Sequence, residues 1–282
     1  RAPGAPMGAF ATESVLDELC RGLGLDPIET RLKNAVKEGT PATFGPKFPP
    51  VGLIETLEEA RAHPNYSVKL GPNQGRGVAS GYWGGETSAS VAIGDDGSVQ
   101  VSIGTVDIGG SRASMALMAA EAFGIPYENV RVSIADTGSL GINEPTHGSR
   151  ATFASGLAII EASREATRKL CQRAADKWGI DADAVTWEDG CAKPSGPNAG
   201  EFDPLTIAEI AAEMGSTGGP ISGHHESTPD GFGGSFGTHV VDVEVDPETG
   251  RTTILRYLVV QDAGKAIHPA YVEGQFQGGA VQ

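Results

Sequence analysis

The first part of the chain carries apolar residues at helical spacing. A first amphipathic helix is predicted to end near Gly22 and Gly24, and its apolar positions are Phe10, Val15, Leu16, Leu19 and Leu23. A second helix is predicted from Asp26 to Lys37, because aspartate is a favoured N-cap and Pro27 a favoured first helical residue. A third is predicted over residues 52–62, and residues 64–77 form a linker. Residues 1–72 are therefore predicted to be a helical segment.

Alternating apolar and polar residues follow and predict a β-hairpin. Its strands are residues 88–93 and 98–103, and the turn is Gly94-Asp-Asp-Gly97. A helix is expected next, because Met115, Leu117, Met118, Ala122 and Phe123 fall close to helical spacing. Another strand is predicted over residues 130–135. This order favours an α+β fold over a doubly wound sheet.

The same order of elements recurs near the end of the chain. Strands at residues 238–245 and 252–260 flank a turn, and a loop at residues 261–269 leads into a helix. Residue identity between the two copies is low, so the repeat lies in the architecture. We therefore predict two related hairpin–loop–helix units, at 73–235 and, truncated, at 236–282.

Residues between the two predicted hairpins also predict one long helix. It begins at the loop Thr146-His-Gly-Ser-Arg-Ala-Thr152. Its buried side is predicted to consist of Phe153, Leu157, Ile160, Leu170, Ala174 and Trp178. A strand pair around Trp187 and a short helix at residues 205–214 follow, and His224-His225 is expected in a polar loop.

Two glycine-bearing loops precede helices and suggest anion sites. Gly109 and Gly110 lie between a strand and a helix, where free backbone N–H groups can bind a phosphate, although such a loop is commonly just a turn. Ser149 and Arg150 open the long helix, and the guanidinium offers a bidentate clamp. The alternative is that Ser149 is an N-cap and Arg150 a surface cation.

Aspartates in the loops of the two units leave a similar choice. Asp107 and Asp262 are either catalytic carboxylates or residues that brace their loops by accepting backbone N–H bonds. His147 and His268 also lie in loops, where hydrogen bonding is the expected role rather than metal ligation.

Composition narrows the class of protein. The 282 residues carry a net charge of −15, which argues against a nucleic-acid or anionic-membrane surface, and no apolar run is long enough to span a bilayer. Three widely spaced cysteines suggest no disulfide framework and a reducing, cytoplasmic environment. Because the chain starts at Arg1 and stops at Gln282 without a cap or polar tail, we expect a segment of a longer protein.

Four stretches together resemble one enzyme family, the molybdenum-binding (large) subunits of the xanthine dehydrogenase/aldehyde oxidase family. Arg1-Ala-Pro-Gly-Ala-Pro6 resembles the family's active-site loop. The other three stretches, Thr105-Val-Asp-Ile-Gly-Gly-Ser111, Gly148-Ser-Arg-Ala-Thr152 and Gln261–Gln275, are similar to its cofactor segments. The likeness runs from end to end of the chain, in order.

The resemblance implies an oxidoreductase that binds molybdenum as molybdopterin or molybdopterin cytosine dinucleotide. It implies that an aldehyde or an N-heterocycle is hydroxylated, and that electrons leave through iron–sulfur clusters and FAD on partner domains or subunits. The implied cofactor-binding residues are Arg1, Ala2, Gly109, Gly110, Ser149, Arg150, Ala151 and Gln275. None of them is a metal ligand.

The sequence departs from the family pattern at three points. Gly110 stands where the family usually has a glutamine, so that contact is lost or replaced. Ala2 stands where the carbon monoxide dehydrogenases have a cysteine, which argues against their chemistry. The family's catalytic glutamate lies beyond Gln282, so we expect no turnover from this segment alone. The competing hypothesis is a non-catalytic phosphate-ligand or structural module on the same scaffold.

Overall fold

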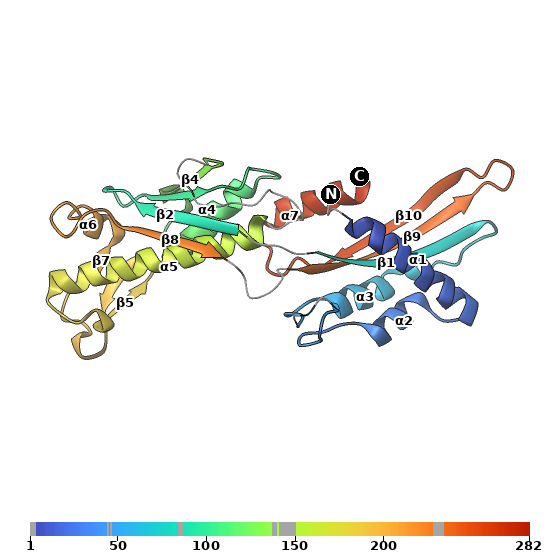
Figure 1. Ribbon diagram of the computed structural model, residues 1–282, viewed down its shortest axis with the longest axis horizontal. Coiled ribbons are helices and arrows are strands. Elements are labelled where there is room, and N and C mark those ends of the chain that lie inside the picture. The colour runs from blue at the N-terminus through green and yellow to red at the C-terminus, as the bar shows by residue number, and fades with distance from the viewer. Residues whose placement is uncertain are drawn as a thin grey trace. The chain divides into compact units, whose positions relative to one another are not determined.

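A computed structural model describes residues 4–43, 45, 47–83, 87–136, 140, 151–227 and 234–282 (Figure 1). The chain forms two compact units. Unit 1 combines residues 1–85 and 230–282, and unit 2 is residues 86–229. This division differs from the predicted boundaries after residues 72 and 235, because the strand at residues 74–83 pairs with residues 235–245 and joins both ends of the chain into one sheet.

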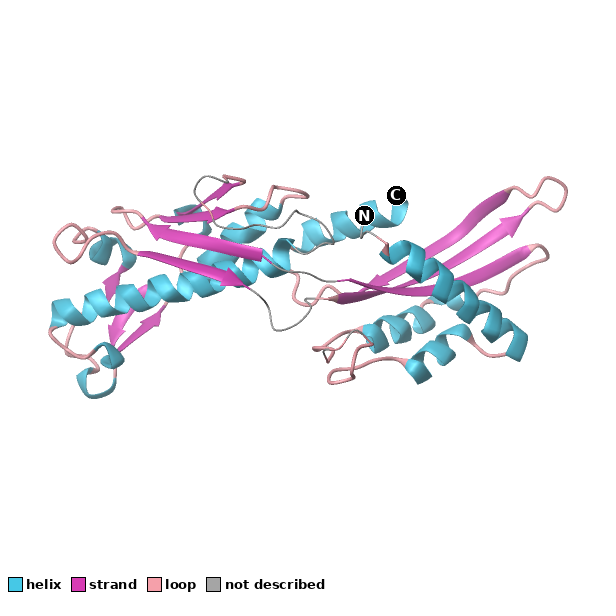
Figure 2. Cartoon of the chain, in the orientation of Figure 1, coloured by secondary structure: helices cyan, strands magenta, loops and turns pink. Residues whose placement is uncertain are grey.

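Unit 1 consists of a three-stranded antiparallel sheet and several helices. Figure 2 colours the strands magenta and the helices cyan. The strand order is β1-β9-β10. The elements are α1 (Ala5–Leu23), α2 (Pro27–Asn34), α3 (Leu53–Ala62), η1 (Pro64–Ser67), β1 (Gln74–Trp83), β9 (Ser235–Val245), β10 (Thr252–Gln261) and α7 (Pro269–Val281).

Helix α1 ends and helix α2 begins where the sequence predicts, whereas α2 ends at Asn34, before the predicted end at Lys37. Gly24 caps α1 in the left-handed conformation, with φ 67°. Asp26 caps α2, and its carboxylate accepts hydrogen bonds from the N–H groups of Ile28 and Glu29, both at 2.9 Å. The core between these helices and the sheet consists of Ile28, Leu53, Leu57, Ala60, Val78, Phe236 and Val240.

Strand β1 lies partly where a linker was predicted. Gly75, Gly77 and Gly81 interrupt the alternation of apolar and polar residues that identifies a strand, so the pattern was not visible. Its pairing with β9 runs from Gln74 opposite Glu244 to Trp83 opposite Ser235.

Unit 2 has a four-stranded sheet in the order β4-β3-β2-β8 and a small sheet in the order β5-β6-β7. Strands β3 and β4 are parallel, and α4 connects them. The elements are β2 (Thr87–Ile93), β3 (Val99–Ile103), α4 (Ser111–Phe123), η2 (Tyr127–Asn129), β4 (Val130–Ile134), α5 (Ala151–Trp178), η3 (Ala182–Ala184), β5 (Val185–Glu188), β6 (Cys191–Pro194), η4 (Gly196–Asn198), β7 (Leu205–Thr206), α6 (Ile207–Ala211) and β8 (Ser222–Ser227).

Helix α5 buries a different face from the predicted one. Phe153 is 40% exposed, whereas Ala158, Ala162 and Ala166 are fully buried. Small residues lie on this face because the sheet approaches closely. A Cβ atom on Gly223 of β8 would stand 1.9 Å from the carbonyl oxygen of Ala162. Of the six predicted buried positions, Leu170 and Ala174 are confirmed.

The His224-His225 pair lies in strand β8, which corrects the prediction of a polar loop. Strand β8 pairs with β2, and His224 is opposite Ser90, with 3.3 Å between the imidazole Nδ1 and the hydroxyl. The strand was not predicted because its residues, Ser222–Ser227, include no alternating apolar positions.

The predicted recurrence of hairpin, loop and helix is confirmed. In unit 2 it is β2, β3 and α4, and in unit 1 it is β9, β10 and α7. The fold is therefore α+β, as predicted. Among the described residues, no helix combines the length and apolar character needed to cross a bilayer.

Candidate cofactor-binding site

The loop before α4 takes a backbone conformation that requires glycine. Gly109 and Gly110 have φ values of 69° and 80°, in the left-handed region that side chains disfavour. Gly110 is the N-cap of α4 and offers no capping side chain. The N–H groups at the start of the helix are therefore not capped by the side chain of the N-cap residue itself.

Asp107 braces this loop. Its Oδ1 accepts hydrogen bonds from the backbone N–H of Arg112 at 3.2 Å and from the hydroxyl of Ser111 at 3.4 Å, and its Oδ2 lies 3.4 Å from the guanidinium of Arg112. Asp107 therefore stabilises its own loop by accepting these hydrogen bonds, which is the second of the two roles considered from the sequence. Its negative charge is paired within the loop.

The donor set at this helix start fits a phosphate group. In the part of the chain that the structure describes, the N–H groups of Gly109, Gly110 and Ser111 have no acceptor, and the helix dipole adds a positive potential there. Exposed apolar side chains precede them, since Val106 is 43% and Ile108 is 53% exposed.

The second predicted loop ends at the start of α5. Ala151 is the first residue of that helix, whereas Ser149 and Arg150 lie outside the described residues. A hydrogen bond links the segment before α4 to the first turns of α5, because the hydroxyls of Thr105 and Ser155 are 2.8 Å apart and buried. Gly109, Gly110 and Ala151 all lie in unit 2, near this bond along the chain.

The remaining predicted site residues belong to unit 1. Gln275 is an exposed residue of α7, and Arg1 and Ala2 lie outside the described residues. Asp262 accepts hydrogen bonds at 2.8 Å from the N–H of Gly52, at the start of α3, and from that of Gly264. It therefore braces its loop, as the corresponding alternative proposed.

Sequence reasoning missed Thr105 and Ser155. Their exposed fractions are 4% and 0%. Thr105 was quoted only as the first residue of a motif, and Ser155 was hidden because Phe153 was assigned to the buried face of its helix. A hydroxyl residue beside each of the two predicted loops is the signal that could have drawn attention to them.

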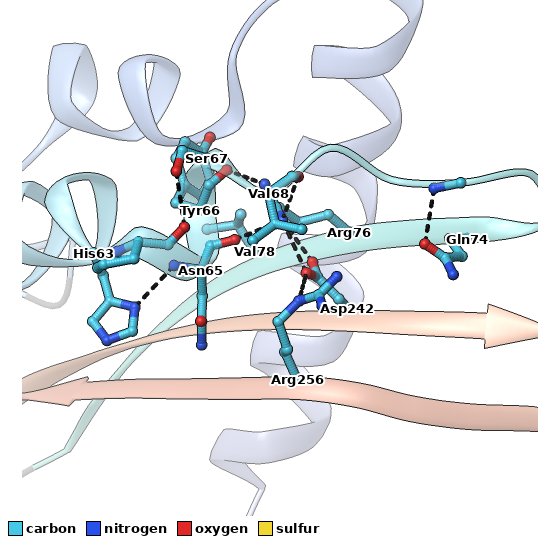
Figure 3. Close-up of polar contacts among 12 residues, drawn as sticks. His63, Asn65, Tyr66, Ser67, Val68, Gln74, Arg76, Val78, Asp242 and Arg256 are labelled. Atoms are coloured by element: carbon cyan, nitrogen blue, oxygen red, sulfur yellow. Dashed lines mark hydrogen bonds and ion pairs between the residues drawn. The ribbon is translucent and has the colours of Figure 1, made fainter.

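Unit 1 also contains a buried charge cluster, drawn in Figure 3. Asp242 is 1% exposed and accepts hydrogen bonds from Arg76 and Arg256. The bonds from Arg76, with those from Arg256, hold the pKa of the Asp242 carboxyl below its usual value, although burial opposes this. Arg76 also donates to the carbonyls of Asn65, Tyr66 and Val68 at the end of η1. This cluster fastens η1 to the sheet, which is a structural role.

Metal ligation by clustered side chains finds no support in the described ranges. No group of three His, Cys, Asp or Glu side chains there is arranged to hold an ion.

Comparison with known proteins identifies the family. A family model described as molybdopterin cofactor-binding domain matches residues 54–282. The xanthine dehydrogenase molybdenum-binding subunit of Escherichia coli O157:H7 is 31% identical over 303 residues, covering 99% of this chain and 40% of that protein. The nicotine 6-hydroxylase large subunit of Paenarthrobacter nicotinovorans is 28% identical, covering 100% of this chain and 38% of that protein. The chain spans about two fifths of these relatives.

Solved structures show the same fold. A CO dehydrogenase from Oligotropha carboxidovorans superposes with a TM-score of 0.82 at 21% identity, covering 96% of this chain and 38% of that chain. The aldehyde oxidoreductase from Desulfovibrio desulfuricans ATCC 27774 gives a TM-score of 0.70 at 26% identity, covering 98% and 30%. The chain therefore belongs to the molybdenum-binding subunit family of the xanthine dehydrogenases and aldehyde oxidases, and residues 54–282 match its molybdopterin cofactor-binding domain.

Proposed function

We propose that this chain binds the phosphates and pterin of a molybdopterin cofactor at the two helix starts of unit 2, within a molybdenum hydroxylase. The observation that carries the proposal is the pair of left-handed glycines, Gly109 and Gly110, at a helix start without a capping side chain. It lies within the residues matched by the molybdopterin cofactor-binding family model. The non-catalytic module is not favoured, because the named relatives are molybdenum oxidoreductase subunits.

The chain's own residues would bind and orient the cofactor. The N–H groups of Gly109 and Gly110 would donate to a phosphate, with Ser149, Arg150 and Ala151 completing the site from the start of α5. Arg1 and Ala2 would approach the metal, and Gln275 would contact the dinucleotide or dithiolene side. The cofactor, as molybdopterin or its cytosine dinucleotide, would supply the two-electron oxidation chemistry.

The whole enzyme is proposed to hydroxylate an aldehyde or an N-heterocycle. The names of the relatives fit both substrate classes, since they include an aldehyde oxidoreductase subunit and a nicotine 6-hydroxylase subunit. Iron–sulfur and FAD domains or subunits would accept the electrons, in the cytoplasm. The catalytic base would be a glutamate beyond Gln282, so residues 1–282 alone are expected to show no dye-linked turnover.

Molybdenum and pterin content per purified full-length protein tests the binding proposal. Arg150→Ala is expected to lose most of the cofactor, because a charge-assisted hydrogen bond is worth about 1.5–3 kcal/mol. Arg150→Lys should recover only part, since an ammonium cannot form a bidentate fork.

The matched control is Arg164→Ala on the same helix. The Arg164 side chain is 62% exposed and pairs with Glu161 at the surface, so this variant should keep its cofactor. Full cofactor in a normally folded Arg150→Ala variant would refute the proposed role of Arg150. Absence of molybdenum and pterin from the unaltered protein, purified from cells that make the cofactor, would refute the function.

A further inference from the structure

A buried hydroxyl pair joins the two helix starts of unit 2. The Thr105 and Ser155 oxygens are 2.8 Å apart, and the residues are 4% and 0% exposed. Thr105 follows β3 and precedes the Gly109-Gly110 loop, and Ser155 lies in the first turns of α5, just after Ala151. The hydrogen bond therefore links the segment that leads into the Gly109-Gly110 loop to the first turns of α5.

Close packing between α4 and α5 reinforces this link. A Cβ atom on Gly156 would stand 2.5 Å from the sulfur of Met118. Gly156 is buried next to Ser155, and Met118 is 6% exposed on α4. Because only the Met118 side chain separates the two helix backbones here, a small change at this point moves α4 relative to α5.

Being buried on α5 does not by itself give a hydroxyl a hydrogen-bond partner. Ser163 is 0% exposed, and its hydroxyl has no hydrogen-bond partner. A buried hydroxyl that is paired with a second one fixes both side chains, whereas an unpaired one contributes packing alone. The pairing of Thr105 and Ser155 thus fixes the segment before α4 against the first turns of α5.

We propose that Thr105 and Ser155 are positioning residues that hold the Gly109-Gly110 loop and the start of α5 at the separation that the cofactor requires. The inference rests on the proposed function of this region, and it adds two residues that act through the backbone segments that they anchor.

The experiment compares Thr105→Val, Ser155→Ala and the double variant in the full-length protein. Hydrogen exchange should accelerate roughly tenfold at the amides of residues 106–112 and 151–154, because one buried hydrogen bond is lost. Molybdenum and pterin content should fall in parallel. The double variant should be no worse than the worse single variant, since both remove the same bond, and Thr105→Ser, which keeps the hydroxyl, should restore both readouts.

Two controls separate positioning from general stability. Thr238→Val removes a buried hydroxyl of unit 1 that lies 3.0 Å from that of Thr56, so it should lower stability without affecting the loops of unit 2. Ser163→Ala should change neither readout. Unchanged exchange in the loops, or faster exchange with full cofactor content, would overturn the positioning role. If the unaltered protein holds no cofactor, the proposed function fails instead, and loop exchange still decides whether the pair anchors the loops.

Discussion

Replacing Asp242 with asparagine should destabilise unit 1, because the carboxylate is the shared acceptor of two arginines. Arg76 donates from Nε to Oδ1 at 2.6 Å and from Nη2 to Oδ2 at 2.9 Å, and Arg256 donates from Nε to Oδ2 at 2.8 Å. An amide keeps the shape of the side chain. It removes the negative charge and turns one acceptor into a donor that faces the arginines.

The expected loss is about 3–5 kcal/mol of unfolding free energy, the usual result of removing one partner of a buried ion pair. The geometry places the effect in this range, since Asp242 has a side chain only 2% exposed and Arg76 only 15%. A matched change at the surface is Glu213→Gln. Its pair with Lys177 has side chains 45% and 38% exposed, so the loss there should be about 0–1 kcal/mol.

The measurement is urea-dependent hydrogen exchange, followed separately in β9 and in β3, so that the two units are resolved. The lowered pKa of Asp242 gives a second signature. Its contribution to stability is present above the unfolded pKa of about 3.9 and is lost as the pH falls through the lower folded value. The difference between the unaltered protein and Asp242→Asn should therefore shrink below about pH 4. A loss under 1 kcal/mol at pH 7, or a difference that grows in acid, would refute the reasoning.

Three further changes should be visible by thermal unfolding. Gly223→Ala should cost more than about 3 kcal/mol of unfolding free energy, because the added Cβ would overlap the Ala162 carbonyl and the backbone would have to move. Gly81→Ala is the control and should be neutral, because open space surrounds Gly81. Equal melting temperatures for the two variants would contradict this. Asp262→Ala should cost about 1–2 kcal/mol by freeing two backbone N–H groups, and Asp262→Asn should recover part of the loss. Arg31→Met should cost about 3–5 kcal/mol, because Arg31 is only 6% exposed and its guanidinium donates to α1, α2 and β1. A smaller loss would show that the carboxylates left without a partner become hydrated.

Local signals in the sequence were sufficient for elements that depend on local chemistry. The helix α2 is an example, because Asp26 and Pro27 specify its start through bonds within one turn. Both hairpins likewise follow from alternation and turn residues. Strand β1 could not be found this way, since its partner β9 is remote in the chain and its glycines carry no pattern.

The prediction of which face of α5 is buried was wrong for a related reason. Hydrophobicity assigns Phe153 to the core, but the close approach of Gly223 requires small residues where it meets the helix, at Ala162 and Ala166. For the site, the glycines at positions 109 and 110 were recognisable from their place between a strand and a helix, and their left-handed backbone explains why both are glycine. The Thr105–Ser155 contact depends on how two helices pack, which spacing along the chain does not encode.

Unit 2 is inserted into unit 1, and this bears on the order in which a ribosome delivers the parts. Ser80 of β1 and Thr238 of β9 are 158 residues apart in the chain and in contact in the sheet. At about 5–20 residues per second, roughly 8–30 s pass between the synthesis of these two strands. During that interval unit 2 emerges as a continuous stretch that is able to fold. Over the same time β1 has been synthesised without its partner strand β9, so its edge is unpaired. An unpaired strand edge can pair with the wrong strand or with another chain. The glycine-rich, weakly apolar sequence of β1 lowers this tendency while its partner is being made.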